Sequence, residues 1–556
     1  MHAQTSHASF NLPLSGVVNV GKTKLQKTTS MKKHIVKLAA ALVLSCSAAN
    51  AALVSIAAGD LTGNTTWTST NEYILEGIVY VKNGTLTINP GTVIRGQPRT
   101  DSTTYNPGTL VITKTAKINA VGTATDPIIF TTAVLNNSGL PKDTDGNGYF
   151  DRAVLSSGAL ASGTFLDANP KTAPLAPVAA STYSNGQFGG NTTILAALTG
   201  GIVVLGDAPT NVDGKVSLGG GLFAIGKSYV EGLTEATDTV YGGYNPLHNS
   251  GKLSYISIRH GGAKLSDANE INGLTLAGVG AGTQVDHIDV YVNFDDGIEV
   301  FGGSVNLKYL NINYCEDDGF DVDQGWTGAA QFLFVLQHPT FGDSLVEADG
   351  HDQDSKNGSS GGVDFMTDTG LPYQNCVITN GTFVGRGASV SLKDGIRMRA
   401  GFGGEVLNNI VIQTAKGVRI DAITGIETAA YGAQIRALAD EIKFRSNTLF
   451  NNTNNTLTFT ANSTTWNSAT AGWNNLTSNP NYKATAFSDV STYVNPVGPQ
   501  SGLPSAFGTV AALPNNPFFT VTTYRGAFST SLTTALWTNG WTALNKAGVL
   551  VSKGNL

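Results

Sequence analysis

The chain has 556 residues, of which 13% are charged and 66 are Gly, with a formal net charge of −6. A charged fraction about half the usual share, combined with abundant Gly, argues against a typical helical cytosolic protein and favours an all-β one. The acidic balance gives no basis for nucleic-acid binding, and no apolar run is long enough to predict a transmembrane segment.

The N-terminal 51 residues are interpreted as targeting sequence. Residues 1–30 form a leader or a mis-called start, and residues 31–51 form a signal peptide. Lys32 and Lys33 precede a short apolar run, and an A-x-A cleavage site ends at Ala51. The pattern predicts a bacterial protein that is secreted or held on the outer cell surface. Processing and lipidation at Cys46 is the open alternative.

A repeated motif predicts the fold of the mature chain. Residues 295–300 (DDGIEV) return as 317–322 (DDGFDV), a step of 319 − 297 = 22 between their glycines. Residues 394–398 (DGIRM) return as 416–420 (KGVRI), again with a step of 22, since 417 − 395 = 22. A Gly followed by an apolar-polar-apolar triplet at a fixed step is typical of a β-solenoid, in which each turn of chain stacks on the last.

Short β-branched runs bounded by Gly, Asn or Pro predict strands along most of the chain. We therefore expect an all-β fold with a parallel β-helix over residues 52–445. Insertions are expected at 134–190 and 338–361, where the repeat breaks, and C-terminal coils and a cap at 446–556. A 3.6-residue apolar period predicts one helix within 428–444.

Several segments resemble one group of proteins. The stretches are 200–211 (GGIVVLGDAPTN), 258–262 (IRHGG), 295–303 (DDGIEVFGG) and 524–528 (YRGAF). They are similar to hallmarks of bacterial secreted right-handed parallel β-helix proteins in the pectate-lyase-like superfamily. The resemblance implies the fold and export. That superfamily includes polysaccharide lyases, glycoside hydrolases, adhesins and phage tailspikes, so the fold alone leaves the function open.

Placing the turns in register predicts rows of side chains. Because side chains alternate along a strand, the apolar members of each triplet point inward and the residue between them points outward. The outward row is expected to contain, in order, Thr275, Glu299, Asp321, Asp364, Arg397 and Arg419. A second outward row contains Asp323, Arg399 and Asp421. Carboxylates are thus followed by arginines along one face.

The carboxylates of this face are candidate metal ligands. Asp295, Asp296, Asp317 and Asp318 of the two Asp-Asp-Gly turns lie beside the outward rows. Calcium takes six to eight oxygen ligands, which such a cluster supplies. The alternatives are a structural acidic ladder, a groove that binds glycan through Glu299, Asp321, Asp323, Trp326 and Arg419, and a catalytic groove. In the resembling lyases, calcium and a basic residue act together, which would make Lys393, Arg397 and Arg399 the candidate catalytic residues.

A second calcium site is predicted in the first insertion. Asp143, Asp145, Asn147 and Asp151 occupy positions 1, 3, 5 and 9 of a calcium-loop pattern that has Gly148 at position 6. Position 12 is Val154 rather than Glu, so the usual bidentate ligand is missing. The alternative is a solvated turn rich in Asp and Asn.

Two further residue types leave alternatives open. Trp326 is either an aromatic platform for a sugar ring or a packing residue. Cys315 and Cys376 form a disulfide or remain two buried thiols.

These features predict a calcium-stabilised β-helix protein that binds extracellular polysaccharide or a cell-surface glycan, or that acts in adhesion. One alternative is a calcium-dependent lyase or hydrolase acting on acidic polysaccharide. The other is a structural component of a surface layer or matrix.

Overall fold

The computed structural model describes most of the chain that follows the expected targeting sequence. The described residues are 51–155, 157–212, 216–219, 222–233, 235–266, 269–351, 372–387, 393–421, 433–461, 464–479, 509–529 and 535–550. The expected leader and all of the expected signal peptide except Ala51 lie outside them.

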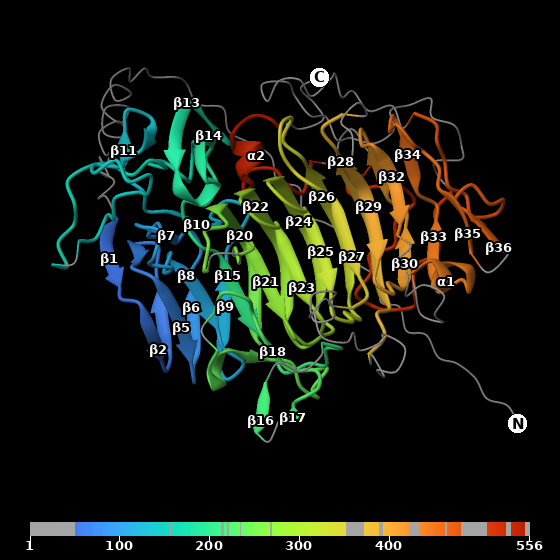
Figure 1. Cartoon of the computed structure of the whole chain (residues 1–556), viewed down its shortest axis with the longest axis horizontal. Helices are drawn as coiled ribbons and strands as arrows, with labels where there is room; N and C mark the ends of the chain where they lie inside the picture. The colour runs from blue at the N-terminus through green and yellow to red at the C-terminus, as the bar shows by residue number, and fades with distance from the viewer. Residues whose placement is uncertain are drawn as a thin grey trace, which may run out of the picture. The chain divides into compact units, whose positions relative to one another are not determined.

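Two long parallel sheets form the body of the protein (Figure 1). Each coil of the chain adds one strand to a ten-stranded sheet and at least one to a 16-stranded sheet, which confirms the predicted parallel β-helix. The ten-stranded sheet consists, in order, of β2 (Gly59–Thr62), β5 (Ile78–Lys82), β8 (Thr109–Ile112), β15 (Ile202–Leu205), β21 (Leu274–Ala277), β23 (Ile298–Phe301), β25 (Phe320–Asp323), β27 (Val346–Asp349), β29 (Asp394–Arg399) and β32 (Lys416–Ile420).

The 16-stranded sheet follows the same coils. Its main path is β1 (Ala52–Ile56), β4 (Asn71–Leu75), β7 (Val93–Gly96), β10 (Ile128–Thr132), β20 (Gly251–Gly261), β22 (Gln284–Asn293), β24 (Asn306–Cys315), β26 (Ala329–Leu336), β28 (Cys376–Val384), β30 (Gly404–Leu407) and β33 (Ile442–Arg445). Five short strands pair beside this path: β3 (Thr65–Trp67), β6 (Thr85–Ile88), β9 (Lys117–Val121), β31 (Ile410–Ile412) and β34 (Thr448–Phe450).

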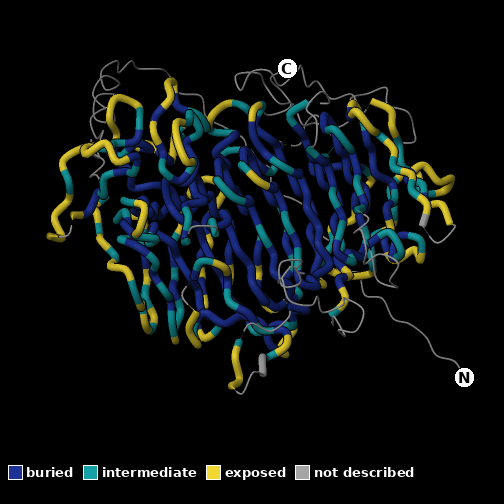
Figure 2. The backbone as a smooth tube through the Cα atoms, in the orientation of Figure 1, coloured by how far each residue is buried: buried dark blue, intermediate teal, exposed yellow. Residues whose placement is uncertain are grey.

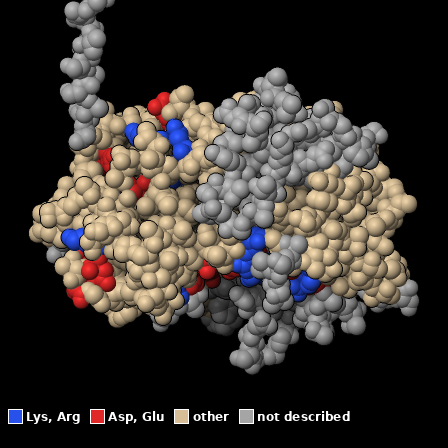
Figure 3. All heavy atoms as spheres, turned by 90° about the horizontal axis from the view of Figure 1, so that it is seen from above, with Lys and Arg blue, Asp and Glu red and all other residues tan. Residues whose placement is uncertain are grey.

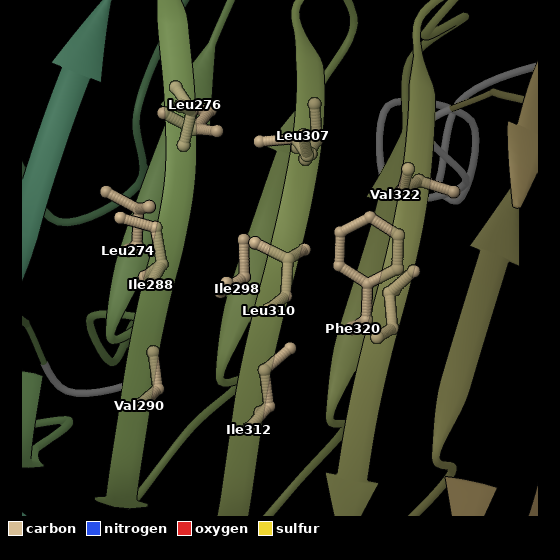
Figure 4. Packing of buried hydrophobic residues seen from close by; sticks show 14 of the residues in the cluster. Leu274, Leu276, Ile288, Val290, Ile298, Leu307, Leu310, Ile312, Phe320 and Val322 are labelled. Carbon is tan, nitrogen blue, oxygen red and sulfur yellow. The ribbon is translucent and has the colours of Figure 1, made fainter. Parts of the chain in front are cut away.

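The core lies between the two sheets and is built from the predicted inward rows. Ile298, Phe320 and Ile396 are 0% exposed, and Val418 one coil further is 3% exposed. Figure 4 shows how side chains from β21, β23 and β25 meet those from β22 and β24 inside the coil. Burial of apolar area contributes roughly 25 cal/mol per Å², so this continuous column is the main stabilising feature of the fold.

A column of left-handed residues bends the long strands of the 16-stranded sheet. Equivalent positions on successive coils have φ between +51° and +63° and carry Tyr255, His287, Tyr309, Phe332, Asn380, Asn408 and Ser446. The first four rings form an aromatic ladder, with centroids 4.1, 4.5 and 5.0 Å apart and nearly parallel planes. Such φ values are strained for bulky residues, and the stacked rings offset that cost.

Two excursions with strands of their own leave the upstream coils in the part of the chain that the structure describes. The first runs between β10 and β15 and contains the predicted insertion at 134–190. It holds β11 (Asn136–Asn137), β12 (Leu140–Pro141), β13 (Val178–Asn185), η1 (Gly186–Phe188) and β14 (Gly190–Ile194). The second, between β15 and β20, was not predicted. It holds β16 (Ser217–Gly219), β17 (Leu222–Phe223), β18 (Ser228–Tyr229), η2 (Thr237–Thr239) and β19 (Val240–Tyr241).

The second excursion covers the outer face of the ten-stranded sheet on its upstream coils. Val230, Leu233 and Tyr241 pack there against Val203 and Phe301. Figure 2 shows the strands of both sheets largely buried, while exposed residues gather in loops and excursions. None of the helices among the described residues is both long and apolar enough to span a membrane.

Two predictions about local structure are wrong. The segment 338–361 is not wholly an insertion, because β27 within it is a regular strand that pairs with β25 and β29. The helix predicted over 428–444 is shorter: α1 (Ala433–Leu438) is followed by β33 of the 16-stranded sheet. The apolar residues of the second half of that segment face the core as a strand, so tertiary pairing overrides the helical period.

The C-terminal region packs against the outside of the coil. After β34, a hairpin of β35 (Thr458–Ala461) and β36 (Thr464–Asn467) follows, and α2 (Ala543–Lys546) lies beside β22 (Figure 1). Residues 518–529, here called the C-terminal strap, run along the column of left-handed residues from the coil of β24 toward the downstream coils. The strap forms hydrogen bonds with Lys308, Gln331, Asn380, Asn408 and Asn447 on successive coils.

Candidate cation-binding site

The ten-stranded sheet places the charged residues of successive coils in register. Glu299 of β23 pairs with Asp321 of β25, and Asp321 pairs with Glu347 of β27. Glu347 in turn pairs with Arg397 of β29, which pairs with Arg419 of β32. The predicted change of sign along this row is confirmed. The position assigned to Asp364 belongs to Glu347, and Asp364 lies outside the described residues.

The Asp-Asp-Gly turns form a second part of the site. Oδ1 of Asp296 accepts the Asp318 backbone N–H at 2.9 Å, and Oδ1 of Asp318 accepts that of Ser344 one coil further. Each second aspartate therefore joins its turn to the next. The glycine is required because the turn lies against the core: a Cβ on Gly319 would be 2.7 Å from the Leu345 carbonyl oxygen and closer still to Val335.

These turns and rows bring carboxylates together in three groups. Within each group, one oxygen from every residue lies within 4.8 Å of the others. The groups are Asp295, Asp296 and Asp317; Asp296, Glu299 and Asp321; and Asp317, Asp318 and Asp343. Asp296 and Asp318 are buried and the others lie nearer the surface. Because hard divalent cations prefer clustered carboxylate oxygens, these acidic groups could hold a metal ion. We call the seven residues the acidic face.

The electrostatics of the acidic face are unfavourable without a cation. Burial raises the pKa values of Asp296, Glu299, Asp318 and Asp321 well above their usual range, and the neighbouring carboxylates raise them further. Among the described residues, none of these four forms a salt bridge. Oδ1 of Asp321 is buried without a hydrogen-bond partner. Like charges at strand spacing repel, so either protons or a cation must compensate.

The cations of the downstream coils are already paired. Nη1 of Arg397 lies 2.8 Å from Oε1 of Glu347, and Nε of Arg399 lies 2.6 Å from Oδ1 of Asp349. Lys393 lies 2.9 Å from Asp343. Neighbouring carboxylates raise the pKa values of both arginines against the opposing effect of burial. A paired arginine with a raised pKa is a poor general base, so the geometry opposes the catalytic role expected for Arg397 and Arg399.

The remaining row residues have structural partners as well. Nη1 of Arg419 lies 3.0 Å from Oδ2 of Asp394, and Arg419 also pairs with Asp421. Asp323 accepts the backbone N–H of Gln324. Arg419 is thus two coils beyond the acidic face and engaged in its own ion pairs. Sequence reasoning missed Glu347 and Asp343, although the triplet Val346-Glu347-Ala348 carries the same apolar-polar-apolar signal as the other turns.

Trp326 does not belong to the surface of the site. Its side chain is 0% exposed, its indole N–H donates to the Val305 carbonyl at 3.0 Å, and its ring meets Phe320 edge to face. The platform prediction is therefore wrong, because the ring is part of the core. Two cysteines are also internal: Cys315 and Cys376 are buried free thiols, and burial raises the pKa of Cys376 to about 12.

The predicted calcium loop of the first excursion is held by hydrogen bonds among its own residues, and calcium binding there stays a prediction. Asp143 accepts the backbone N–H groups of Gly146 and Gly148 at 2.8 and 2.9 Å. Asp145 accepts from Asn147, and Asp151 accepts from Thr144. These bonds define an Asx-type turn. The carboxylate groups that come within 4.8 Å of one another in the described chain do not include this loop.

Charged side chains are sparse on the surface as a whole. Figure 3 shows small groups of acidic and basic residues among uncharged ones on the face in view. Against that background, the concentration of carboxylates on two adjacent coils is the most distinctive chemical feature among the described residues.

Comparison with known proteins supports the fold. A family model described as a pectate-lyase like beta helix domain matches residues 59–144 and 190–493, which is more than half of the chain. The gap between the matched parts falls in the first excursion. No curated protein and no solved structure gives a significant match.

Proposed function

Because the chain belongs to the pectate-lyase-like β-helix family, we propose that it binds divalent cations, calcium in particular, on its acidic face and through them an acidic extracellular polysaccharide. The signal-peptide pattern at 31–51 supports a location outside the cell, where calcium is abundant. In this proposal the protein is a binding or adhesion module, not a cleaving enzyme.

One observation carries the proposal. Asp296, Glu299 and Asp321 bring their oxygens within 4.8 Å of each other, and Oδ1 of Asp321 is buried without any partner. A bound cation would supply that partner and offset the burial and the mutual repulsion that raise the three pKa values. With one oxygen from each carboxylate, the group fills three of the six to eight positions that calcium takes, so positions remain for a polysaccharide carboxylate or for water.

The pairing of the basic residues favours binding over cleavage. A lyase needs a base that can accept a proton beside the metal-bound carboxylate. Lys393, Arg397 and Arg399 each contact a carboxylate of a neighbouring coil. Ion pairs of this kind join the downstream coils, which is a structural role.

The test compares calcium binding in matched variants of the full chain. Calcium added to chelator-treated protein is expected to raise the melting temperature, because a ligand bound only by the folded state stabilises it by about 2.7 kcal/mol at 100 times its Kd. Glu299→Gln combined with Asp321→Asn should remove most of that shift. Glu405→Gln, on β30 of the other sheet, removes one carboxylate without touching the acidic face and should leave the shift unchanged.

Polysaccharide binding is then measured with and without calcium. Retention on immobilised polygalacturonate or alginate should require calcium and should be lost in the double variant. An unchanged melting temperature on calcium addition would contradict the cation site. New ultraviolet absorbance from unsaturated uronate ends would show that the protein cleaves its ligand and would overturn the binding-only proposal.

A further inference from the structure

A second site lies on the 16-stranded sheet, away from the acidic face. A pocket of about 470 Å³ opens between residues 281–287, the start of β24 and Phe518 of the C-terminal strap. Pockets that hold small ligands typically measure roughly 300–1,000 Å³, so this one has room for a sugar residue. None of the residues that line this pocket belongs to the acidic face.

The acceptors of the pocket are already occupied. Asp286 is the carboxylate in its lining. Its Oδ1 accepts from the Ser254 hydroxyl at 2.5 Å and from Nδ1–H of His287 at 2.7 Å. Its Oδ2 accepts from Nε2 of Gln284 at 2.7 Å. The negative charge of Asp286 is therefore bound internally and repels an anionic ligand less than a free carboxylate would.

The donors of the pocket, by contrast, are only partly used. Nζ of Lys308 donates to the Phe518 carbonyl at 2.6 Å and to the Thr520 hydroxyl at 3.0 Å, which leaves one of its three N–H groups. Oδ1 of Asn306 accepts the Ala329 backbone N–H at 3.0 Å. The amide N–H groups of Asn306 have no acceptor among the described residues. Burial lowers the pKa of Lys308, an effect that a bound anion would oppose.

The aromatic rings that line the pocket also favour an oxygen acceptor. His287 and Tyr309 line the pocket and are inner members of the aromatic ladder, so neighbouring rings cover both of their faces. Only their edges remain for a ligand. Ring edges carry partial positive charge and favour oxygen acceptors over a cation. Spare N–H donors, one ammonium and ring edges thus converge on a single small volume.

We propose that this pocket binds one carboxylate-bearing sugar residue directly, without a metal ion. The carboxylate lies against Lys308 and the Asn306 amide, and the sugar hydroxyls face the remaining polar lining. This site extends the proposed function, since both sites select acidic sugars, but it does not depend on calcium. Chelator therefore separates the two sites experimentally.

The test uses two sugars that differ mainly in one group. D-Glucuronate and D-glucose are titrated into the full chain in excess chelator, with ligand-observed NMR or calorimetry as the readout. We expect glucuronate to bind at least tenfold more tightly than glucose. Asn306→Asp keeps the acceptor for Ala329 but replaces the donor with a negative group, so it should abolish this preference. Lys308→Arg should largely retain it, and Lys308→Met should lose it.

Controls separate this site from the acidic face and from unfolding. Lys443→Gln removes an exposed lysine that pairs with Glu405 on the far coils and should leave glucuronate binding unchanged. The double variant Glu299→Gln/Asp321→Asn should also leave it unchanged. Melting temperatures confirm that each variant is folded. Equal binding of both sugars, or full glucuronate binding by folded Asn306→Asp, would overturn the proposal, whereas loss in the double variant would place the anion at the acidic face instead.

Discussion

Arg397 lies between Glu347 and Asp421, with Nη1 2.8 Å from Oε1 of the former and Nε 2.9 Å from Oδ2 of the latter. This pairing belongs to the coils downstream of the acidic face, where arginines of the ten-stranded sheet neutralise its carboxylates. Upstream of it, Glu299 and Asp321 have no such partner among the described residues. The acidic face is thus bounded on one side by ion pairs and on the other by the second excursion, which packs Val230 and Leu233 against the sheet and adds the carboxylate of Glu231.

We expect the metal-free protein to lose stability as pH rises from about 4 to about 7. Burial raises the pKa of Glu316 to about 7, so the folded state holds a proton that the unfolded chain has already released. When the folded state binds more protons than the unfolded state, the free energy of unfolding falls with pH. Each unit of difference in pKa corresponds to about 1.4 kcal/mol.

Thermal unfolding in chelator at pH 5 and pH 8 measures this effect. The melting temperature should be higher at pH 5, and the increase produced by calcium should be larger at pH 8, because metal binding requires ionised carboxylates. A calcium effect that grows as pH falls would be inconsistent with carboxylate ligands.

Replacing Arg397 with Met should destabilise the protein by about 2 kcal/mol. The substitution removes a partner from Glu347, whose carboxylate is only 9% exposed, and leaves that charge with Arg399 alone. Removing one member of a buried pair costs roughly 3–5 kcal/mol, and the partial exposure of Arg397 reduces this value. Urea unfolding of Arg397→Met, Glu347→Gln and the double variant gives the coupling free energy. Purely additive effects would show that the pair does not interact.

Gly319→Ala should be strongly destabilising, by about 2–4 kcal/mol. The new Cβ would overlap Val335 and the Leu345 carbonyl, which belong to the packed interior and cannot move freely. Gly190→Ala is the matched control, because a Cβ there meets nothing within 4 Å. Similar melting temperatures for the two variants would contradict the tight packing of the Asp-Asp-Gly turn.

Trp326→Ala should reduce stability by about 3–5 kcal/mol, the usual cost of removing a buried aromatic side chain. The indole is completely buried and fills the coil next to Phe320. Glycan affinity of the folded fraction should be unchanged. A variant of normal stability with weakened glycan binding would restore the surface-platform interpretation.

The 22-residue step was sufficient to predict the inward and outward rows wherever turns have equal length. Ile298, Phe320, Ile396 and Val418 all face the core, as that register requires. Prediction failed at Glu347 because the step from Phe320 to Val346 is 346 − 320 = 26, so the intervening loop is four residues longer. A motif search at a fixed step passes over such a coil.

Other features were inaccessible to sequence reasoning for physical reasons. Arg399 pairs with Asp349, which lies 50 positions earlier in the chain. Because the segment between their strands can have any length, no fixed step in the sequence predicts this pair. The aromatic ladder was missed because its members are separated by steps of 32, 22 and 23 residues (287 − 255, 309 − 287, 332 − 309). Burial of Trp326 depends on whether the turn after β25 directs its side chain into the core or toward solvent. The composition of the sequence does not reveal this direction.

The C-terminal strap also imposes an order on assembly. Its partners Lys308, Gln331, Asn380 and Asn408 lie on four successive coils, and all precede it in the chain. A strap can dock only where those coils already stand in register, so its contacts must form late. Contacts absent from the folding transition state slow unfolding without accelerating folding. The strap is therefore expected to slow unfolding. Truncation of the chain just before Phe518 should speed unfolding far more than it slows refolding.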